Sequence, residues 1–280
     1  MAIAYNQIGS LRELLDILKD EGINDFQTLD EIRKFRDNFD NLLDDIRIKN
    51  KELLDNNIVK LESERKNISE VIDKKLKVRE ELLKKEQKEI PSKIAELENK
   101  RSKILIPVYW IRKKILLRRK NILETNFEKI LKRPFWYKIL RLKSVVTELD
   151  DKKNNTEKWI DSMSEKEIKR AQFILSALVE NKLTFYGAEG EERAVNELKK
   201  LPDTYVIIND YRKNFKPPLY DRKDNAVISS IQIDHLVVGP TGVHIIETKN
   251  WSQKSVNSRD LFSPVQQLMR TSYAVFIILN

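Results

Sequence analysis

The chain has 280 residues, a formal net charge of +9, and 35% charged residues against a usual value of about 25%. It contains no cysteine and only two histidines. This excludes disulfides, thiolate zinc sites and cysteine nucleophiles, and it makes a multi-histidine metal centre a poor candidate. Any catalysis must therefore rest mainly on carboxylates and lysines.

No segment predicts a membrane span or a secretion signal. The apolar stretch ILIPVYWI, from Ile104 to Ile111, is far shorter than the roughly 20 residues that a spanning helix needs, and it runs into Arg112. The first residues lack a basic region followed by an apolar one. We therefore expect a cytoplasmic protein.

Residues 1–28 predict a small helical element of their own. From about Phe39, apolar residues recur at helical spacing and predict long helices that pack along one stripe. They stand seven apart in two runs: Leu54, Leu61 and Ile68, then Leu76, Leu83, Ile90, Leu97 and Ile104. One eight-residue step and several polar companion positions weigh against a strict parallel zipper, so a dimer and an intramolecular hairpin both stay open.

Prolines are the main expected interruptions, because glycine is absent from residues 23–186. Pro91, Pro107 and Pro134 are the candidates, and we expect chain reversals near Pro107 and Pro134. A last long helix is predicted from about Tyr137 to Leu183. Residues 29–183 thus predict a helical, coiled-coil-like arm.

A basic aromatic band at residues 100–143 accounts for the net charge, with 15 basic and 2 acidic side chains. Basic groups neutralise phosphates and aromatic faces stack on bases, so the band indicates nucleic-acid binding. The candidate contacts are Trp110, Arg112, Lys113, Lys114, Arg118, Arg119, Lys120 and Trp136. A solvated or self-associating helix face and an anionic membrane surface are the alternatives.

The composition changes at Gly187: four of the six glycines, counting Gly187 itself, and five of the eight prolines occur from this residue onward. A helix is predicted over residues 190–201 and a short strand over residues 204–210. A polar, proline-containing loop is predicted from Arg212 to about Asn225. Two further strands, residues 226–239 and 242–251, are joined by the hairpin signal GPTG.

The hairpin predicts where the acidic residues lie. With Pro240 and Thr241 as its loop, Asp234 opposes Glu247, and Lys249 points to the same face because side chains alternate along a strand. A type I turn with a bulge at Gly242 would shift this register by one.

The opposed carboxylates Asp234 and Glu247 repel unless they share a proton or bind a cation. Mg²⁺ takes one or two carboxylates with waters and phosphate, and an ammonium such as that of Lys249 can orient or deprotonate an attacking water. A phosphodiester-hydrolysing centre is therefore predicted. A surface salt bridge between Lys249 and one acid is the alternative.

Three segments in this order, GAEGEERAVNEL, IQIDHLVVGPTGVHIIETKNW and SPVQQ, resemble the nuclease-related domain NERD of the PD-(D/E)xK nuclease superfamily. The resemblance covers about residues 186–280. It implies an αβββαβ nuclease fold, a Mg²⁺ or Mn²⁺ cofactor, and a role in DNA processing. Its implied site residues are Glu191 (or Glu192) on the helix, the metal ligands Asp234 and Glu247, the catalytic Lys249, and the helix residue Gln267.

The segment departs from the family at Ser263, which replaces an asparagine and can also cap a helix. We interpret His235 and His244 as ordinary strand residues and Trp251 as a packing residue. The residues after Pro264 predict one helix, with a short helix followed by a strand as the alternative. In the first case the chain stops before the final strand of the expected fold.

We therefore expect an α+β protein with a helical arm before a small PD-(D/E)xK-type α/β domain. The expected function is metal-dependent hydrolysis of nucleic acid, with DNA as the substrate and with the arm for oligomerisation or nucleic-acid holding. The alternative is a non-catalytic nucleic-acid-binding or scaffold protein. A membrane partner is not expected.

Overall fold

The computed structural model describes residues 1–99, 106–222, 226–250 and 264–279. The chain forms two compact units. The first combines Met1–Asp44 with Lys166–Asn280, and the second is Asp45–Glu165.

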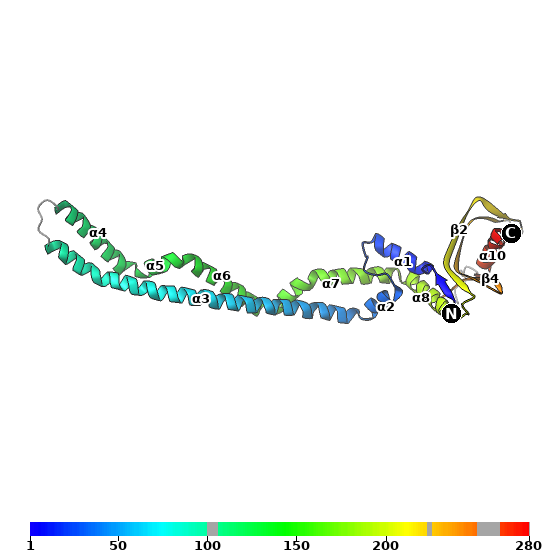
Figure 1. Ribbon diagram of the computed structural model, residues 1–280, viewed down its shortest axis with the longest axis horizontal. Helices are drawn as coiled ribbons and strands as arrows, with labels where there is room; N and C mark the ends of the chain where they lie inside the picture. Colours follow the sequence, from blue (N-terminus) through cyan, green and yellow to red (C-terminus); the bar gives the residue numbers. More distant parts are fainter. Residues whose placement is uncertain (100–105, 223–225, 251–263, 280) are drawn as a thin grey trace. The chain divides into compact units, whose positions relative to one another are not determined.

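The second unit is an antiparallel helical hairpin (Figure 1). The outgoing helix is α3 (Phe39–Asn99). The return consists of α4 (Ile106–Thr125), α5 (Phe127–Lys132), the 3-10 turn η2 (Arg133–Phe135), α6 (Trp136–Asn154) and the first part of α7 (Thr156–Glu180), whose residues from Lys166 onward belong to the first unit. Ion pairs show that the two arms of the hairpin are antiparallel, because the partners appear in reverse order along the return: Glu98 with Lys113, Glu86 with Arg119, and Glu64 with Arg141.

An apolar seam holds the hairpin together. Four α3 positions from the predicted sevenfold spacing are buried: Leu54, Leu61, Leu83 and Ile90. Four residues of the returning helices pack against this seam and are buried: Leu123, Leu131, Val145 and Leu149. Of the two arrangements that the spacing left open, the structure has the intramolecular hairpin. Ile104, the last position of the series, lies outside the described residues.

Two prolines do not interrupt the arm as predicted. α3 continues through Pro91, where burial of Ile90 and Leu83, at about 1.5–3 kcal/mol each, offsets an interior-proline cost of about 3 kcal/mol. Pro134 lies in the first turn of η2, where a missing N–H costs little, so the predicted reversal there is wrong. The reversal expected near Pro107 precedes α4. The described part of the basic band therefore runs along the return, not around two turns.

The single helix predicted from Tyr137 to Leu183 is also wrong. α6 and α7 are separated at Asn155, whose side-chain amide donates to Asp151 Oδ1 at 2.7 Å. Such local hydrogen bonds compete with helix continuation.

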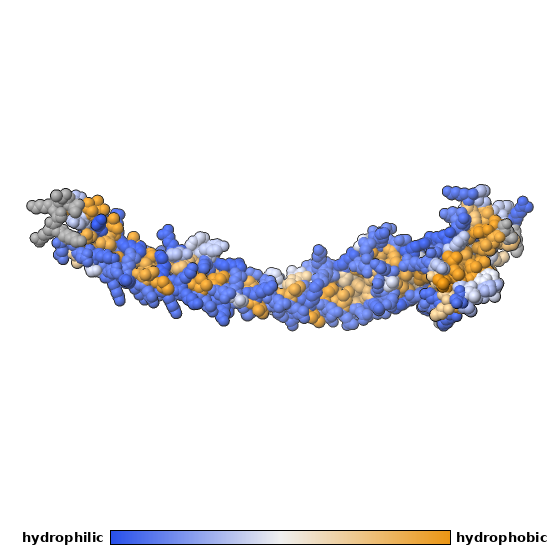
Figure 2. Space-filling view, in the orientation of Figure 1, coloured by the Kyte–Doolittle hydropathy of each residue, from blue (hydrophilic) through white to orange (hydrophobic). Residues whose placement is uncertain are grey.

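On the face drawn in Figure 2, hydrophobic patches alternate with hydrophilic ones along these helices. Across the ranges that the structure describes, no helix has the length and apolar composition to cross a membrane.

The first unit contains one four-stranded sheet in the order β1-β2-β3-β4. The strands are β1 (Ile3–Tyr5), β2 (Val206–Asp221), β3 (Ala226–Gly239) and β4 (Gly242–Ile246). β1 is parallel to β2, and the other neighbours are antiparallel. The sheet therefore joins the first residues of the chain to its last hundred.

The loop predicted from Arg212 to Asn225 is largely strand. β2 continues to Asp221 and pairs with β3, with a register irregularity between Asn214 and Leu219. Pro217 and Pro218 lie in this irregularity, and the Lys216–Pro217 bond is cis. Because proline cannot donate to the ladder, the prolines interrupt the pairing without ending the strand.

Helix α8 (Lys182–Leu198) begins earlier than predicted and runs through Gly187 and Gly190. A Cβ at Gly190 would lie 2.8 Å from the Cβ of Asn250, so this glycine allows the segment after β4 to pack closely on the helix. The glycines that suggested a domain start are therefore packing positions within a helix.

The residues after Pro264 form the single helix α10 (Pro264–Leu279). Its buried residues Ala274 and Val275 pack with Ile228 and Ile233 of β3. The prediction of one helix is confirmed. The order α8, β2, β3, β4, α10 agrees with the first five elements of the expected αβββαβ arrangement.

Residues 1–28 were predicted as a small separate element, but they share a core with the last hundred residues. Helix α1 (Gly9–Asp20) and α2 (Leu29–Asp37) contribute to the same buried cluster as α7 and α8. Its members include Leu11, Leu14, Leu18, Ile32, Leu178, Phe185 and Val195. Sequence patterns do not reveal this packing, because the contacting residues stand more than a hundred positions apart.

Candidate active site

The β3–β4 hairpin has the predicted register. Gly239 pairs with Gly242 and His235 with Ile246, without the one-residue shift. Gly242 has φ +121°, a conformation that disfavours other residues. β4 ends at Ile246, yet the Thr248 N–H donates to Asp234 Oδ2 at 2.8 Å. This hydrogen bond thus connects Asp234 to the segment that carries Glu247 and Lys249.

Asp234 and Glu247 are carboxylates in a poorly solvated setting. The Glu247 side chain is 4% exposed and forms an ion pair with Lys249. Burial raises the pKa of Glu247, partly opposed by hydrogen bonds from Lys249 and Gln267, and the charge of Asp234 raises it further. Burial also raises the pKa of Asp234, partly opposed by the Thr248 N–H and by Lys249. Gln267 thus extends from α10 to this pair.

Glu191 joins the site from α8. It is buried, and its carboxylate accepts hydrogen bonds from the Ser10 N–H at 3.3 Å and from Ser10 Oγ. Burial raises the pKa of Glu191; the Ser10 hydrogen bonds oppose this, and the Asp234 charge adds to it. The neighbouring Glu192 pairs instead with Arg33 at 2.9 Å. Of the two candidate helix carboxylates, Glu191 is the one beside Asp234.

A further carboxylate, Asp210, escaped the sequence analysis. It stands opposite Asp234, since Asn209 pairs with His235 and Tyr211 with Ile233. Its φ is +48° and its side chain is 1% exposed.

The Asp210 carboxylate is held by a dense polar network. Arg212 Nε donates to it at 2.9 Å and Gln232 Nε2 at 3.0 Å, and Arg12 forms an ion pair with it. Its charge also raises the pKa of Asp234. The sequence signal that could have identified Asp210 was its position at the end of the apolar run TYVIIND.

The acidic residues open on a cavity of about 460 Å³. Its lining comes from α1, α8, β3 and the segment after β4, and includes Ser10, Tyr186, Glu191, Gln232, Asp234 and Lys249. The structure thus brings together three of the predicted site residues around one opening, with Glu247 and Gln267 adjacent to them.

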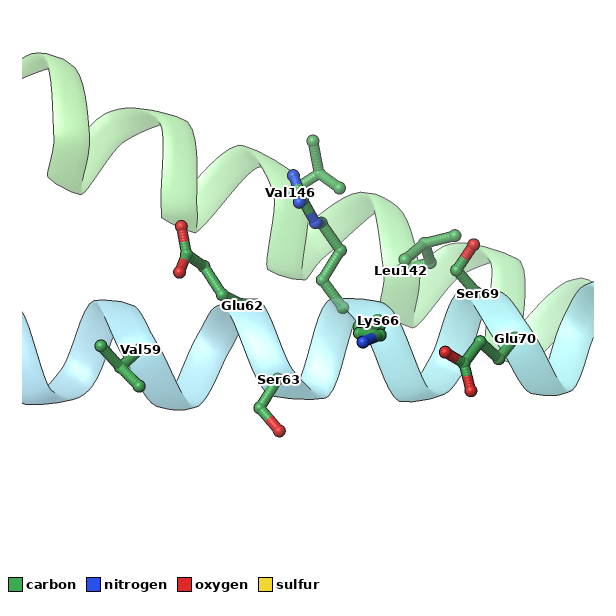
Figure 3. A pocket seen from close by; sticks show the side chains of 9 residues that line it. Val59, Glu62, Ser63, Lys66, Ser69, Glu70, Leu142 and Val146 are labelled. Atoms are coloured by element: carbon green, nitrogen blue, oxygen red, sulfur yellow. The ribbon is translucent and has the colours of Figure 1, made fainter.

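A second cavity, of about 830 Å³, is a groove between α3 and α6 (Figure 3). Val59, Glu62, Lys66 and Glu70 of α3 line one side of it, and Leu142 and Val146 of α6 the other. Its lining on α3 contains two acids, Glu62 and Glu70, and two bases, Arg65 and Lys66, and Glu62 is already paired with Lys153. The groove therefore lacks the concentration of like charges found around Asp234.

The donor set of the acidic cavity fits a hard divalent cation that retains water. Within the described ranges, no group of three or more Asp, Glu or His side chains is close enough to hold an ion by itself. Two buried carboxylates with raised pKa are nonetheless the set that Mg²⁺ takes with waters and phosphate oxygens. A bound cation would offset the cost of burying these two carboxylates, and that burial is the main cause of both raised pKa values.

The histidines lie outside this donor set. His235 is fully buried on the opposite face of β3 from Asp234, and its Nδ1 lies 2.9 Å from Asn209 Oδ1. His244 Nε2 lies 2.9 Å from Thr241 Oγ1 at the hairpin turn. The interpretation of both as ordinary strand residues is confirmed. Trp251 and Ser263 lie outside the described residues.

Acidification is expected to destabilise the first unit through His235. Burial lowers the pKa of His235 from 6.5 to about 4. Because this folded-state pKa lies below the unfolded one, the contribution is complete above about pH 6.5 and is lost as the pH falls to about 4, a change of about 3 kcal/mol. Urea unfolding of wild type and His235→Gln at pH 7 and pH 4.5 checks it. His244→Gln is the matched control, and an unchanged acid loss in His235→Gln contradicts the prediction.

The basic residues of α4 fall into two sets. Lys113, Arg119 and Lys120 pair with Glu98, Glu86 and Glu124. In the described part of the chain, Arg112, Lys114 and Arg118 have no carboxylate partner, and Lys114 Nζ lies 4.8 Å from the centroid of the Trp110 ring. Trp110 and Trp136 are each 62% exposed. Half of the predicted basic contacts are therefore already neutralised within the hairpin.

Residues 186–278 match the family NERD, the nuclease-related domain. The match covers the C-terminal third of the chain and includes all five predicted residues of the acidic site. The comparisons with curated proteins and with solved structures found no match. The resemblance seen in the sequence is thus confirmed for this third of the chain.

Proposed function

We propose that this protein, which carries a nuclease-related domain at residues 186–278, is a cytoplasmic nuclease that hydrolyses phosphodiester bonds of DNA with Mg²⁺ or Mn²⁺. One observation carries the proposal. Asp234 and Glu247 lie side by side with raised pKa values, next to Lys249 and to the cavity that Glu191 lines. Burying two neighbouring acids is costly, and a bound cation would offset that cost.

In this proposal each side chain has a distinct task. Asp234 and Glu247 would hold the cation, which when bound polarises a phosphate and lowers the pKa of water. Lys249 has a side chain that is 33% exposed beside Glu247, so its ammonium can hold the attacking water or the phosphate charge. Gln267 fixes the Glu247 carboxylate through its hydrogen bond. Glu191 would orient groups at the edge of the cavity.

The test is incubation of the purified protein with single- and double-stranded DNA and RNA in Mg²⁺, Mn²⁺ or EDTA. We expect cleavage of DNA that EDTA stops. Cleavage of RNA alone would correct the substrate class, and no cleavage with either metal contradicts the proposal.

A second candidate function is nucleic-acid binding without turnover. It is favoured by the Lys249–Glu247 ion pair and by the lack, among the described residues, of a three-carboxylate group that could hold a metal. This alternative predicts an affinity that falls linearly with log salt and no metal-dependent product. The cleavage assay separates the two functions.

The basic band of the arm is proposed to hold nucleic acid through Arg112, Lys114 and Arg118. Replacing these three by glutamine is expected to lower the slope of log affinity against log salt by about 2–3, because each phosphate contact contributes about 0.9. The matched control replaces Lys113, Arg119 and Lys120, whose charges already face carboxylates. Fluorescence anisotropy over a salt series measures both slopes, and equal losses in the two variants contradict the assignment.

Homo-oligomerisation through the arm also remains a proposal. Three isoleucines of α4 are between 45% and 59% exposed: Ile111, Ile115 and Ile122. A second copy of the chain would cover them. Light scattering coupled to size exclusion measures the oligomeric state.

A further inference from the structure

The N-terminal segment lies outside the family match but is built into the acidic site. β1 pairs with β2 from Ile3 opposite Val206 to Tyr5 opposite Ile208. Directly after it, Asn6 and Asn209 exchange amide-to-backbone hydrogen bonds of 3.3 and 3.0 Å. These contacts fix where α1 begins relative to the strands.

The start of α1 meets the acidic residues at two points. A Cβ at Gly9 would lie 3.0 Å from Asp210 Oδ1, so glycine accommodates a close approach of the helix start to this carboxylate. One residue on, Ser10 donates both its N–H and its Oγ–H to Glu191. On the other side, a Cβ at Gly187 would lie 3.0 Å from Ser10 Oγ. Ser10 of α1 therefore lies against α8, with Glu191 as its acceptor.

Two residues further along α1, Arg12 forms its ion pair with Asp210. A helix N-terminus and a guanidinium thus face two carboxylates that flank Asp234. Both interactions hold these carboxylates in one fixed orientation. Without them, the buried acids would face each other with fewer donors.

We propose that Ser10 is a positioning residue of the nuclease-like site: through its hydroxyl and backbone N–H it holds Glu191 in the orientation that cation and substrate binding require. This inference rests on the proposed function. It means that the working site is assembled from two segments, residues 2–12 and the nuclease-related domain, which are about 180 positions apart in the chain.

The test uses the full chain and measures Mn²⁺ affinity by calorimetry in addition to cleavage. Ser10→Ala is expected to bind Mn²⁺ about tenfold more weakly, the usual effect of removing a hydrogen-bond partner of a site carboxylate. It should lower kcat more than it raises KM. Ser10→Thr, which keeps the hydroxyl, is expected to restore most of the affinity. Ser92→Ala, which removes a helix hydroxyl bonded to the Glu89 carbonyl, is the control.

Folding loss is tested separately by the thermal melt of each variant. If Ser10→Ala does not fold, Gly187→Ala provides the second variant, since its methyl group would press on Ser10 Oγ, and the same weakening is expected. Wild-type Mn²⁺ affinity in folded Ser10→Ala, with loss of affinity in Asp234→Ala, overturns this inference alone. Wild-type affinity in Asp234→Ala overturns the proposed metal site.

Discussion

Replacement of Asp234 by asparagine is expected to lower Mg²⁺-dependent kcat/KM by at least about a thousandfold, equivalent to about 4 kcal/mol of transition-state stabilisation. Asp234 stands opposite Asp210 of β2 and lies next to Glu247, which belongs to the segment after β4. Asparagine keeps an acceptor for the Thr248 N–H but removes the charge that a cation needs. Single-turnover cleavage of a labelled DNA measures the loss.

The same variant is expected to be at least as stable as wild type without metal. Because burial raises the folded-state pKa of Asp234 above its unfolded value, folding favours the protonated form, and stability is lost as the pH rises through this range. Asparagine removes that loss. The melting temperature of Asp234→Asn in EDTA should therefore equal or exceed that of wild type at pH 8, with the difference closing towards pH 4. A less stable and still active variant contradicts both the metal and the electrostatic arguments.

Replacement of Lys249 by methionine is expected to lower kcat by about 10²–10⁴ while Mn²⁺ binding is retained or tightened. The ammonium competes with a cation for the Glu247 carboxylate, so its removal frees a ligand. It also removes the group that holds the attacking water or the phosphate charge. Calorimetry and steady-state kinetics separate the two effects.

The matched control for Lys249 is Lys200→Met, which breaks an exposed ion pair with Glu197 in the same unit. This control should leave both kcat and Mn²⁺ affinity unchanged. If Lys249→Met raises KM at constant kcat, Lys249 binds substrate and takes no part in the chemical step.

Local patterns in the sequence predicted much of the geometry of the acidic pair. The GPTG turn and strict strand alternation predicted that Asp234 and Glu247 face each other, and the observed pairing of Gly239 with Gly242 agrees. The sevenfold spacing likewise predicted the buried positions Leu54 and Leu61. Both predictions use the periodicity of side-chain directions over a few helical turns or strand residues. This periodicity follows directly from the order of residues in the chain.

Signals that depended on single residues were less reliable. Pro134 predicted a reversal, yet it occupies a helix start where its missing donor is tolerated. Pro217 and Pro218 predicted a loop, yet β2 passes them because pairing resumes at Leu219. In each case the position of the proline in the folded chain, which the residue type alone does not reveal, made its missing N–H tolerable.

The sequence by itself predicted the helical seam, the placement of Asp234 and Glu247 on one hairpin, and the resemblance of the last third of the chain to NERD, because each is written in neighbouring residues. The structure decided between the two hairpin registers that the sequence left open. Only the tertiary structure decided that Ser10, Arg12 and Asp210 belong with Glu191 and Asp234. The reason is physical: buried carboxylates need donors from wherever the fold can supply them. Here the fold supplies them from a helix that begins about 180 residues earlier in the chain.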